Sequence, residues 1–149
     1  MTSSQIIIEP IGEVSTNTTD NRISKDRKVL ISDIEIYPRY QQSLEGLDLY
    51  SHIFVLFWME RETREYALME NPRGNTNLKK TGVLAARGRN HPNPIGLTVC
   101  ELLEKKNTGL KVRKLDAYNQ TKIIDIKPYD DYDVVSEPKI PNWLSALRI

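Results

Sequence analysis

Seven short strand-like segments, separated by clusters of Pro, Gly and Asn, constrain the fold of this chain more than any other feature. In one of them Ile34 and Ile36 alternate with acidic residues, as in a strand with one buried face. Another, His52–Met59, is apolar almost throughout, which is typical of a strand buried on both faces. The segments are 5–14, 29–37, 52–59, 81–86, 95–103, 109–117 and 122–129. Their spacing predicts an all-β fold, mostly antiparallel, arranged as a small barrel or a sandwich.

Helical signals are few, and we expect only one or two short helices. The stretch Arg61–Glu70 is compatible with two helical turns, which the following Asn-Pro would end. The tail 140–149 favours one short helix that packs Trp143 and Leu147. The polar stretch Ser15–Asp26 shows no periodicity and is expected to be the most flexible part.

The length of 149 residues predicts a single domain with a real core. The longest apolar run, Ile53–Met59, is far too short to span a membrane, and the N-terminus shows no secretion signal. The lone Cys100 cannot form an internal disulfide, and we expect it to be a small buried residue in a strand. These features favour the reducing cytoplasm as the location of the protein.

The cations of the chain are unevenly distributed, although its net charge is only +1. Between Asn71 and Leu115, ten Lys and Arg residues stand against two Glu residues, a net charge of +8 over 45 residues. Such a segment attracts phosphate backbones. The alternative is a solvated face whose counter-charges fold against it.

Several common chemistries are excluded by residues that the chain lacks. No two of its seven glycines lie two residues apart, so neither a dinucleotide-binding Gly-rich turn nor a phosphate-binding P-loop is present. One Cys and two His residues do not provide a zinc site of the usual ligand spacing, and we expect no metal. Ser51 and His52 are neighbours, so on a strand they would face opposite ways and would not form a nucleophile–base pair.

Three stretches together resemble one protein family. They are "SLEGLDLYSHIFVLFWM" (43–59), "TGVLAARGRNHPNPIGLTVCEL" (81–102) and "KLDAYNQTKIIDIKPYD" (114–130). Their order, with P-N-P-I-G followed by D-I-K-P-Y, is similar to that in the TrmO/TsaA-like family of S-adenosylmethionine-dependent tRNA methyltransferases. The resemblance implies a small β-barrel that pairs into a homodimer, binds S-adenosylmethionine near the interface and methylates N6 of threonylcarbamoyladenosine beside the tRNA anticodon. Larger members carry an extra C-terminal domain, and we expect this chain to be a single barrel domain over 1–149 without it.

The loop "RGRNHPNPIG" is the most distinctive part of the resemblance. Pro92 and Pro94 restrict the backbone from His91 to Pro94, so the loop can present Asn93 to a ligand without a large ordering cost. Gly96 would then keep side-chain bulk away from that ligand. A rigid barrel corner without a ligand is the alternative.

The resemblance also implies roles for individual residues. Arg87, Asn93 and Leu97 are expected to bind the cofactor, with Arg87 clamping its carboxylate (or a tRNA phosphate) and Leu97 packing on its adenine. Asp125 and Lys127, which share one face of a strand, are expected to orient the substrate, and Asp125 is the candidate base for the N6 proton; a structural ion pair is the alternative. The remaining cofactor candidates are Glu60, Arg61, Asn119, Gln120, Thr121 and Lys122, and the tRNA candidates are Lys79, Lys80, Arg89, His91 and Tyr129.

The chain departs from the family pattern at several of these positions. Glu60-Arg61 replaces His-Gln, His91 replaces an arginine, and Asn119–Lys122 replaces D-G-T-P. Three functions therefore remain open: a tRNA methyltransferase, a methyltransferase of the same fold that acts on a small metabolite, and a non-catalytic module that binds the cofactor or tRNA. The basic segment favours RNA over a metabolite, whereas the altered turn favours a binding module over an enzyme.

Overall fold

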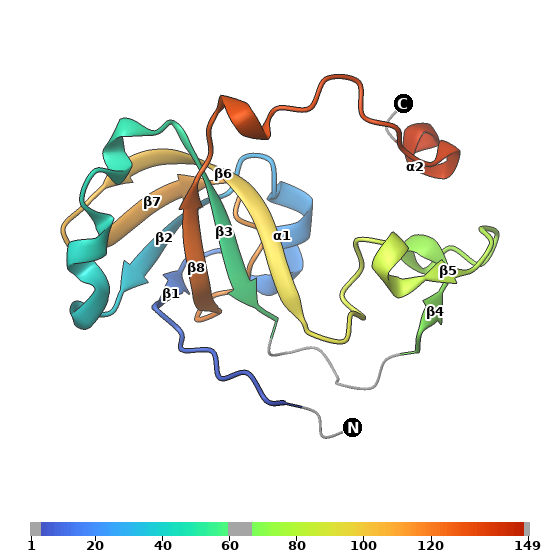
Figure 1. Cartoon of the computed structure of the whole chain (residues 1–149), viewed down its shortest axis with the longest axis horizontal. Coiled ribbons are helices and arrows are strands. Elements are labelled where there is room, and N and C mark those ends of the chain that lie inside the picture. Colours follow the sequence, from blue (N-terminus) through green and yellow to red (C-terminus); the bar gives the residue numbers. More distant parts are fainter. Residues whose placement is uncertain (1–3, 60–66, 148–149) are drawn as a thin grey trace.

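Six strands close into an antiparallel β-barrel with the strand order β1-β2-β7-β6-β3-β8 (Figure 1). The computed structural model describes residues 4–59 and 67–147. The barrel strands are β1 (Gly12–Ser15), β2 (Ile31–Ile36), β3 (His52–Trp58), β6 (Ile95–Lys105), β7 (Gly109–Arg113) and β8 (Lys122–Pro128). Every neighbouring pair is antiparallel, which confirms the all-β fold and decides between the barrel and the sandwich.

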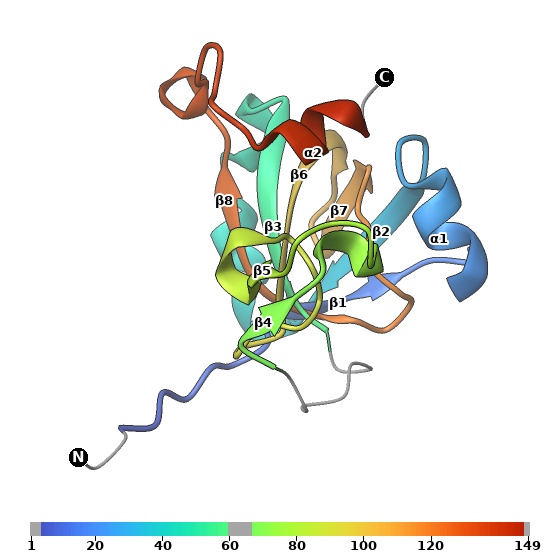
Figure 2. The ribbon, with the colours of Figure 1, turned by 90° about the vertical axis from the view of Figure 1, so that its right-hand side faces the viewer.

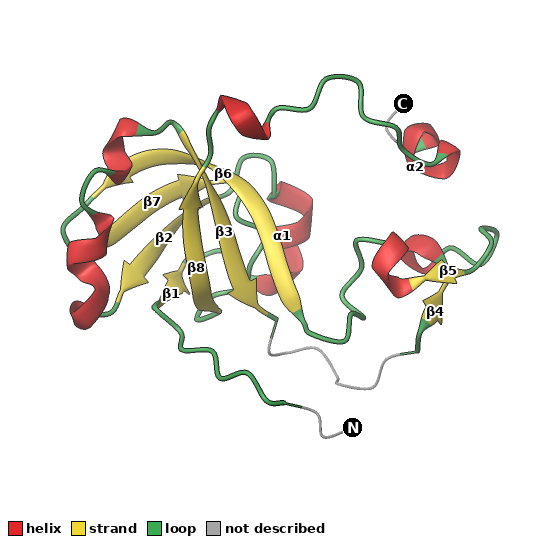
Figure 3. Ribbon diagram, in the orientation of Figure 1, coloured by secondary structure: helices red, strands yellow, loops and turns green. Residues whose placement is uncertain are grey.

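The remaining elements are short (Figure 3). In the described part of the chain they are a two-stranded sheet, two α-helices and five 3₁₀ helices: β4 (Met69–Glu70), β5 (Thr81–Gly82), α1 (Asp20–Asp26), α2 (Asn142–Ala146), η1 (Pro38–Leu44), η2 (Leu47–Leu49), η3 (Pro72–Gly74), η4 (Val83–Ala85) and η5 (Asp131–Asp133). The helix expected in the tail is α2, in which Trp143 is half-buried, but Leu147 is 51% exposed and does not pack as expected. Of the helical turns expected at 61–70, residues 61–66 lie outside the described residues, and Met69–Glu70 forms β4.

The barrel interior is filled by aliphatic side chains that alternate along each strand. In β3, Ile53, Val55 and Phe57 are buried, whereas Phe54 and Leu56 between them are half-buried. The prediction that this strand is buried on both faces was therefore wrong, because a closed barrel has only one interior and the other face of each strand points outward. Cys100 is fully buried in β6, as expected for a small core residue.

Within the polar stretch 15–26, Asp20–Asp26 forms α1, a helix that the sequence did not predict. Ile23 is 1% exposed, and Arg22 and Asp26 form an i,i+4 ion pair at 3.2 Å. One buried isoleucine therefore anchors a helix that has no sustained apolar period.

Two predicted strands are shorter than expected. From the segment 5–14 only its end enters the barrel, as part of β1, while Ile6 and Ile7 are 85% and 90% exposed. Pro10 has no backbone donor, and the chain before it has no neighbouring strand in the barrel. From the segment 81–86 only Thr81–Gly82 forms a strand, and the 3₁₀ turn η4 follows.

Residues 67–94, which we call the excursion, leave the barrel between β3 and β6. Figures 1 and 2 show that the excursion projects from one side of the barrel and that α2 lies on the same side. Pro72, Val83 and Ala86 are buried within the excursion and do not belong to the barrel core. The excursion therefore has buried residues of its own, and the chain returns to the barrel at Ile95.

Candidate functional site

The loop 87–94 joins the excursion to β6 and is fixed at both ends. At its start, Nε2 of His91 donates a hydrogen bond to the carbonyl of Ala86 at 2.7 Å. At its end, the Met59 amide donates to the carbonyl of Pro94 at 2.8 Å. Asn93 between the two prolines is exposed. The loop thus presents an amide side chain from a restrained backbone, as the sequence predicted.

A side chain at position 96 is excluded for a reason other than the expected one. Gly96 is buried, and a Cβ placed on it would lie 2.2 Å from the ring of Phe57. The space is therefore occupied by a core aromatic ring and not by a ligand, because this face of β6 points into the barrel.

Arg87 and Leu97 meet at an edge of β6 that has no strand beside it. The pairing of β7 with β6 runs only from Glu101 to Lys105, which leaves Ile95–Val99 paired on the β3 side alone. There Nη2 of Arg87 donates to the carbonyl oxygen of Leu97 at 3.3 Å, and the side chain of Leu97 is 48% exposed. The guanidinium keeps further donors for another partner.

The outward side chains of β3, β6 and β8 form what we call the outer face. Leu56 of β3 stands opposite Leu97 of β6 on one side and opposite Asp125 of β8 on the other. These three residues therefore lie in one row across three adjacent strands, which are spaced about 4.8 Å apart. The apolar members of the outer face are Phe54, Leu56, Trp58, Ile95, Leu97 and Val99.

Asp125 and Lys127 share this face, as predicted, and form an ion pair of 2.9 Å between Nζ and Oδ2. The second carboxylate oxygen, Oδ1, accepts a hydrogen bond from the Ile126 amide at 2.9 Å. The register shifts at this point of the pairing with β3, so that Ile123 is buried and Ile126 packs on the core. Ile124 falls at this bulge and has no partner in the register with β3.

Tyr129 follows β8 and lies at the border of the outer face. Its ring centroid is 5.4 Å from that of Phe54 and 6.3 Å from that of His52. Tyr129 is half-buried, and its neighbour Phe54 stands opposite Lys127 in the register.

Residues 119–122 lie at the junction of β8 with β1, the strand on the opposite side of β8 from β3. Oδ1 of Asn119 accepts from the Thr16 amide, while the Gln120 amide and the Thr121 carbonyl bond to Val14. Nζ of Lys122 donates to Glu13 at 2.7 Å, which is the main reason why the pKa of Lys122 is raised above its ordinary value. These contacts help to close the barrel, and they engage the side chains of Asn119 and Lys122, two of the residues expected to bind the cofactor.

The basic segment divides into two parts of different character. On the β6–β7 hairpin, Lys105, Lys106 and Arg113 pair with Glu45, Asp33 and Glu101 at 3.8, 3.7 and 2.6 Å. The excursion with the start of β6, Asn71 to Cys100, contains five Lys and Arg residues and no Asp or Glu. Its exposed cations are Arg73, Lys79, Lys80, Arg87 and Arg89, and His91 is half-buried among them. Glu60 and Arg61 lie outside the described residues.

One protein family has a sequence model, described as the tRNA-methyltransferase O N-terminal domain, that matches residues 19–133. The chain belongs to this family. A probable S-adenosyl-L-methionine-binding protein of Methanothermobacter thermautotrophicus is 40% identical to it and aligns with 89% of this chain and 97% of its own length. A tRNA (adenine(37)-N6)-methyltransferase of Rattus norvegicus is 31% identical over 86% of this chain.

Other relatives of this tRNA-methyltransferase O domain are longer than the chain. The chain spans 32% of the rat enzyme, and it spans 35% of a probable S-adenosyl-L-methionine-binding protein of Archaeoglobus fulgidus that is 36% identical over 91% of the chain. The crystal structure of TrmO from Pseudomonas aeruginosa superposes on 93% of the chain with a TM-score of 0.70 and 27% identity, and the match covers 61% of that chain. The barrel is thus the fold of this family.

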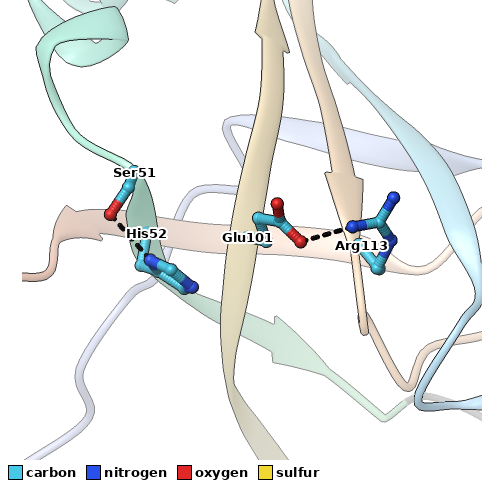
Figure 4. Close-up of polar contacts among 4 residues, drawn as sticks. All are labelled: Ser51, His52, Glu101 and Arg113. Atoms are coloured by element: carbon cyan, nitrogen blue, oxygen red, sulfur yellow. Dashed lines mark hydrogen bonds and ion pairs between the residues drawn. The ribbon is translucent and has the colours of Figure 1, made fainter.

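A contact between Ser51 and His52 was missed at the level of sequence. Oγ of Ser51 lies 2.7 Å from Nδ1 of His52 (Figure 4), although the two were expected to face opposite ways. Ser51 precedes the first residue of β3, so the alternation of a strand does not apply to it. His52 stands opposite Glu101 in the register, and Glu101 is itself paired with Arg113.

The described residues hold no group of three or more His, Cys, Asp or Glu side chains that would bind a metal. Within the same residues no helix has the length and apolarity needed to cross a membrane.

Proposed function

We propose that the chain binds S-adenosylmethionine and transfers its methyl group to N6 of threonylcarbamoyladenosine beside the anticodon of tRNA. The observation that carries this proposal is the row of Leu97, Leu56 and Asp125 on the outer face, with Arg87 at one end and the restrained loop 87–94 beside it. The family and the named activities of its relatives support the same reaction.

The residues at this place fit the cofactor. The half-exposed Leu97 offers an apolar surface to an adenine ring, and the free donors of Arg87 suit a carboxylate. Asn93 supplies an amide from a backbone that needs little ordering. When bound, the cofactor supplies an activated methyl group on a sulfonium.

The chain's own contribution is alignment. In-line placement of two reacting groups contributes on the order of 7–11 kcal/mol in favourable cases. Asp125 would accept the N6–H of the substrate once Lys127 moves its ammonium to a tRNA phosphate, since Lys127 is 65% exposed and free to swing. Asp125 then holds the proton that N6 loses as the new N–C bond forms.

The excursion provides the surface for tRNA. The sequence between Asn71 and Cys100 has five cations and no acidic residue, so its field attracts phosphates, whereas Lys105, Lys106 and Arg113 on the hairpin are already paired. Lys79, Lys80, Arg89 and His91 contact the backbone in this proposal, and Tyr129 stacks on a base near the outer face.

The proposal includes a homodimer that works in the cytoplasm. Ile95, Leu97 and Val99 are 39%, 48% and 38% exposed on neighbouring positions of one strand. Together with Phe54, Leu56 and Trp58 they form an apolar centre bordered by Asp125, Lys127, His52 and Glu101, which is the composition of a protein interface with a polar rim. A second copy that packs against this centre would enclose the cofactor between the two chains, on Leu97.

A non-catalytic binding module is the second candidate. It is favoured by one observation, namely that both carboxylate oxygens of Asp125 already have partners. Such a module would bind the cofactor and tRNA without turnover.

The deciding experiment incubates the purified protein with tRNA that contains threonylcarbamoyladenosine and with methyl-labelled cofactor, followed by mass spectrometry of the nucleosides. Label on the modified adenosine, lost in the Asp125→Asn variant, supports the enzyme. Cofactor binding by calorimetry without any label transfer supports the module. No binding heat at a protein concentration of about 100 μM leaves only affinities weaker than about millimolar and refutes both.

A further inference from the structure

The side chain of Glu70, in β4, contacts the loop 87–94. Nδ2 of Asn90 donates a hydrogen bond to Oε2 of Glu70 at 3.2 Å. The other carboxylate oxygen, Oε1, lies so close to Gly88 that a Cβ there would be 2.7 Å from it. One carboxylate therefore contacts two positions of the loop, on either side of Arg89.

The strand that carries Glu70 is held independently of this loop. Glu70 pairs with Thr81, and Met69 pairs with Gly82. Next to them, Nδ2 of Asn71 donates to the carbonyl of Leu78 at 2.8 Å, and the Val83 amide donates to that of Leu68 at 3.0 Å. Glu70 thus sits on the most extensively bonded part of the excursion.

The start of the loop, residues 87–90, depends on the contact with Glu70 more than its end, residues 91–94, does. Pro92 and Pro94 restrict the end, and the Met59 amide holds Pro94. Residues 87–90 contain no proline and include Gly88, the residue with the greatest backbone freedom. Among the contacts of this part of the loop are the Arg87–Leu97 bond, the His91–Ala86 bond and the contacts of Glu70.

We propose that Glu70 is a positioning residue, whose carboxylate clasps Gly88 and Asn90 and thereby holds Arg87 at the open edge of β6. This inference rests on the proposed function, since Arg87 is the residue that would clamp the cofactor carboxylate. Loss of the clasp should weaken cofactor binding without any loss of a direct contact to the ligand.

Glu70 also has an electrostatic role in the same place. It is the one acidic residue of the sequence between Ala67 and Cys100, next to five cations. Replacing it by Gln keeps an oxygen for the Asn90 amide but raises the local net charge by one. Glu70→Gln is therefore expected to strengthen tRNA binding at low salt and to change cofactor affinity less than threefold. Glu104→Gln, an equal change of charge on an exposed residue at the end of β6, serves as the matched control.

The test swaps the side chains of residues 70 and 90, so that the amide and the carboxylate change places. Asn90→Asp brings two carboxylates together and should speed hydrogen exchange of the Met59 and Ile95 amides, which donate to the loop carbonyls of Pro94 and Asn93, and lower cofactor affinity, each by about tenfold. Adding Glu70→Gln to Asn90→Asp again pairs an amide donor with a carboxylate acceptor, now with the amide on residue 70. The exchange rate and the cofactor affinity should both return to within about threefold of wild type. Exchange at Val55 and Cys100 in the barrel should stay unchanged throughout, which separates a local clasp from general loss of stability.

Three results would overturn the inference. If Glu70→Ala and Asn90→Asp leave loop exchange at the wild-type rate, or if the double variant is no better than Asn90→Asp, there is no clasp and the inference is wrong. If loop exchange responds as expected but cofactor affinity does not, Glu70 orders the loop without positioning Arg87, which also overturns the inference. If the wild-type protein binds no cofactor, the proposed function fails and the positioning role falls with it, while loop exchange still reports the clasp itself.

Discussion

Replacing Lys79 and Lys80 together by Ala is expected to flatten the salt dependence of tRNA binding. Both side chains are exposed on the excursion, and neither makes an ion pair within residues 4–59 and 67–147. Each phosphate contact contributes about 0.7–0.9 to the slope of log affinity against log salt, so two contacts contribute about 1.4–1.8. Over a fourfold rise in salt, the affinity of the wild type should therefore fall about tenfold more than that of the variant.

The assay is a titration of labelled tRNA, read by fluorescence anisotropy, at several salt concentrations between about 50 and 200 mM. Several different tRNAs should weaken alike, because phosphate contacts carry little sequence information. The matched control is the double replacement of Lys105 and Lys106 by Ala, which removes the same charge. Its slope should change by less than half as much, because these ammonium groups already lie 3.8 and 3.7 Å from carboxylates of Glu45 and Asp33.

Two outcomes would contradict these expectations. Equal flattening by both double variants would mean that tRNA responds to net charge at long range and not to contacts on the excursion. An unchanged slope in both would mean that the basic segment is a solvated face, and a methyltransferase acting on a small metabolite would then become the better reading of the outer face.

Further changes test the cofactor contact and the core. Arg87→Ala should weaken cofactor binding in calorimetry and leave the salt slope of tRNA binding nearly unchanged; a change of the slope alone would make Arg87 a phosphate contact. Gly96→Ala should lower the free energy of unfolding by about 1–3 kcal/mol in urea titrations, because its Cβ meets the Phe57 ring, whereas Gly82→Ala, which has open space, should have a much smaller effect. Burial raises the pKa of the Cys100 thiol to about 12, so native Cys100 should react with thiol reagents at pH 8 only after unfolding. Because the unfolded thiol ionises first, near pH 9, its linkage should lower stability as the pH rises from there toward 12, and Cys100→Ser should reduce that slope.

The fold was predictable because apolar alternation marks each strand of a barrel. Val14, Ile34 and Val55 fall where a period of two places them, and all are buried. The errors came from residues whose environment depends on distant neighbours. The exposed Ile6 and Ile7 have the composition of a strand but no partner strand, and Ile23 anchors a helix that polar residues surround.

The site was predictable in part for a similar reason. The shared face of Asp125 and Lys127 follows from strand geometry alone, and their ion pair is a local consequence of it. The closeness of Leu97 to Asp125 depends on the register of β3 between two other strands, which no local pattern encodes. Glu70 was missed because its partners, Gly88 and Asn90, are about twenty residues away in the sequence.

A cluster of cations in a sequence predicts binding partners poorly until the fold is known, and the basic segment shows why. Its ten cations are one continuous feature in the sequence, yet the barrel divides them. Those on the hairpin meet Asp33 and Glu45, which come from β2 and the chain after η1, so strand pairing itself brings counter-charges to them. In the sequence of the excursion, by contrast, Glu70 is the one acidic residue between Ala67 and Cys100. In the proposed function tRNA therefore meets the part of the segment that leaves the barrel, and this part includes the loop on which the proposed cofactor site depends.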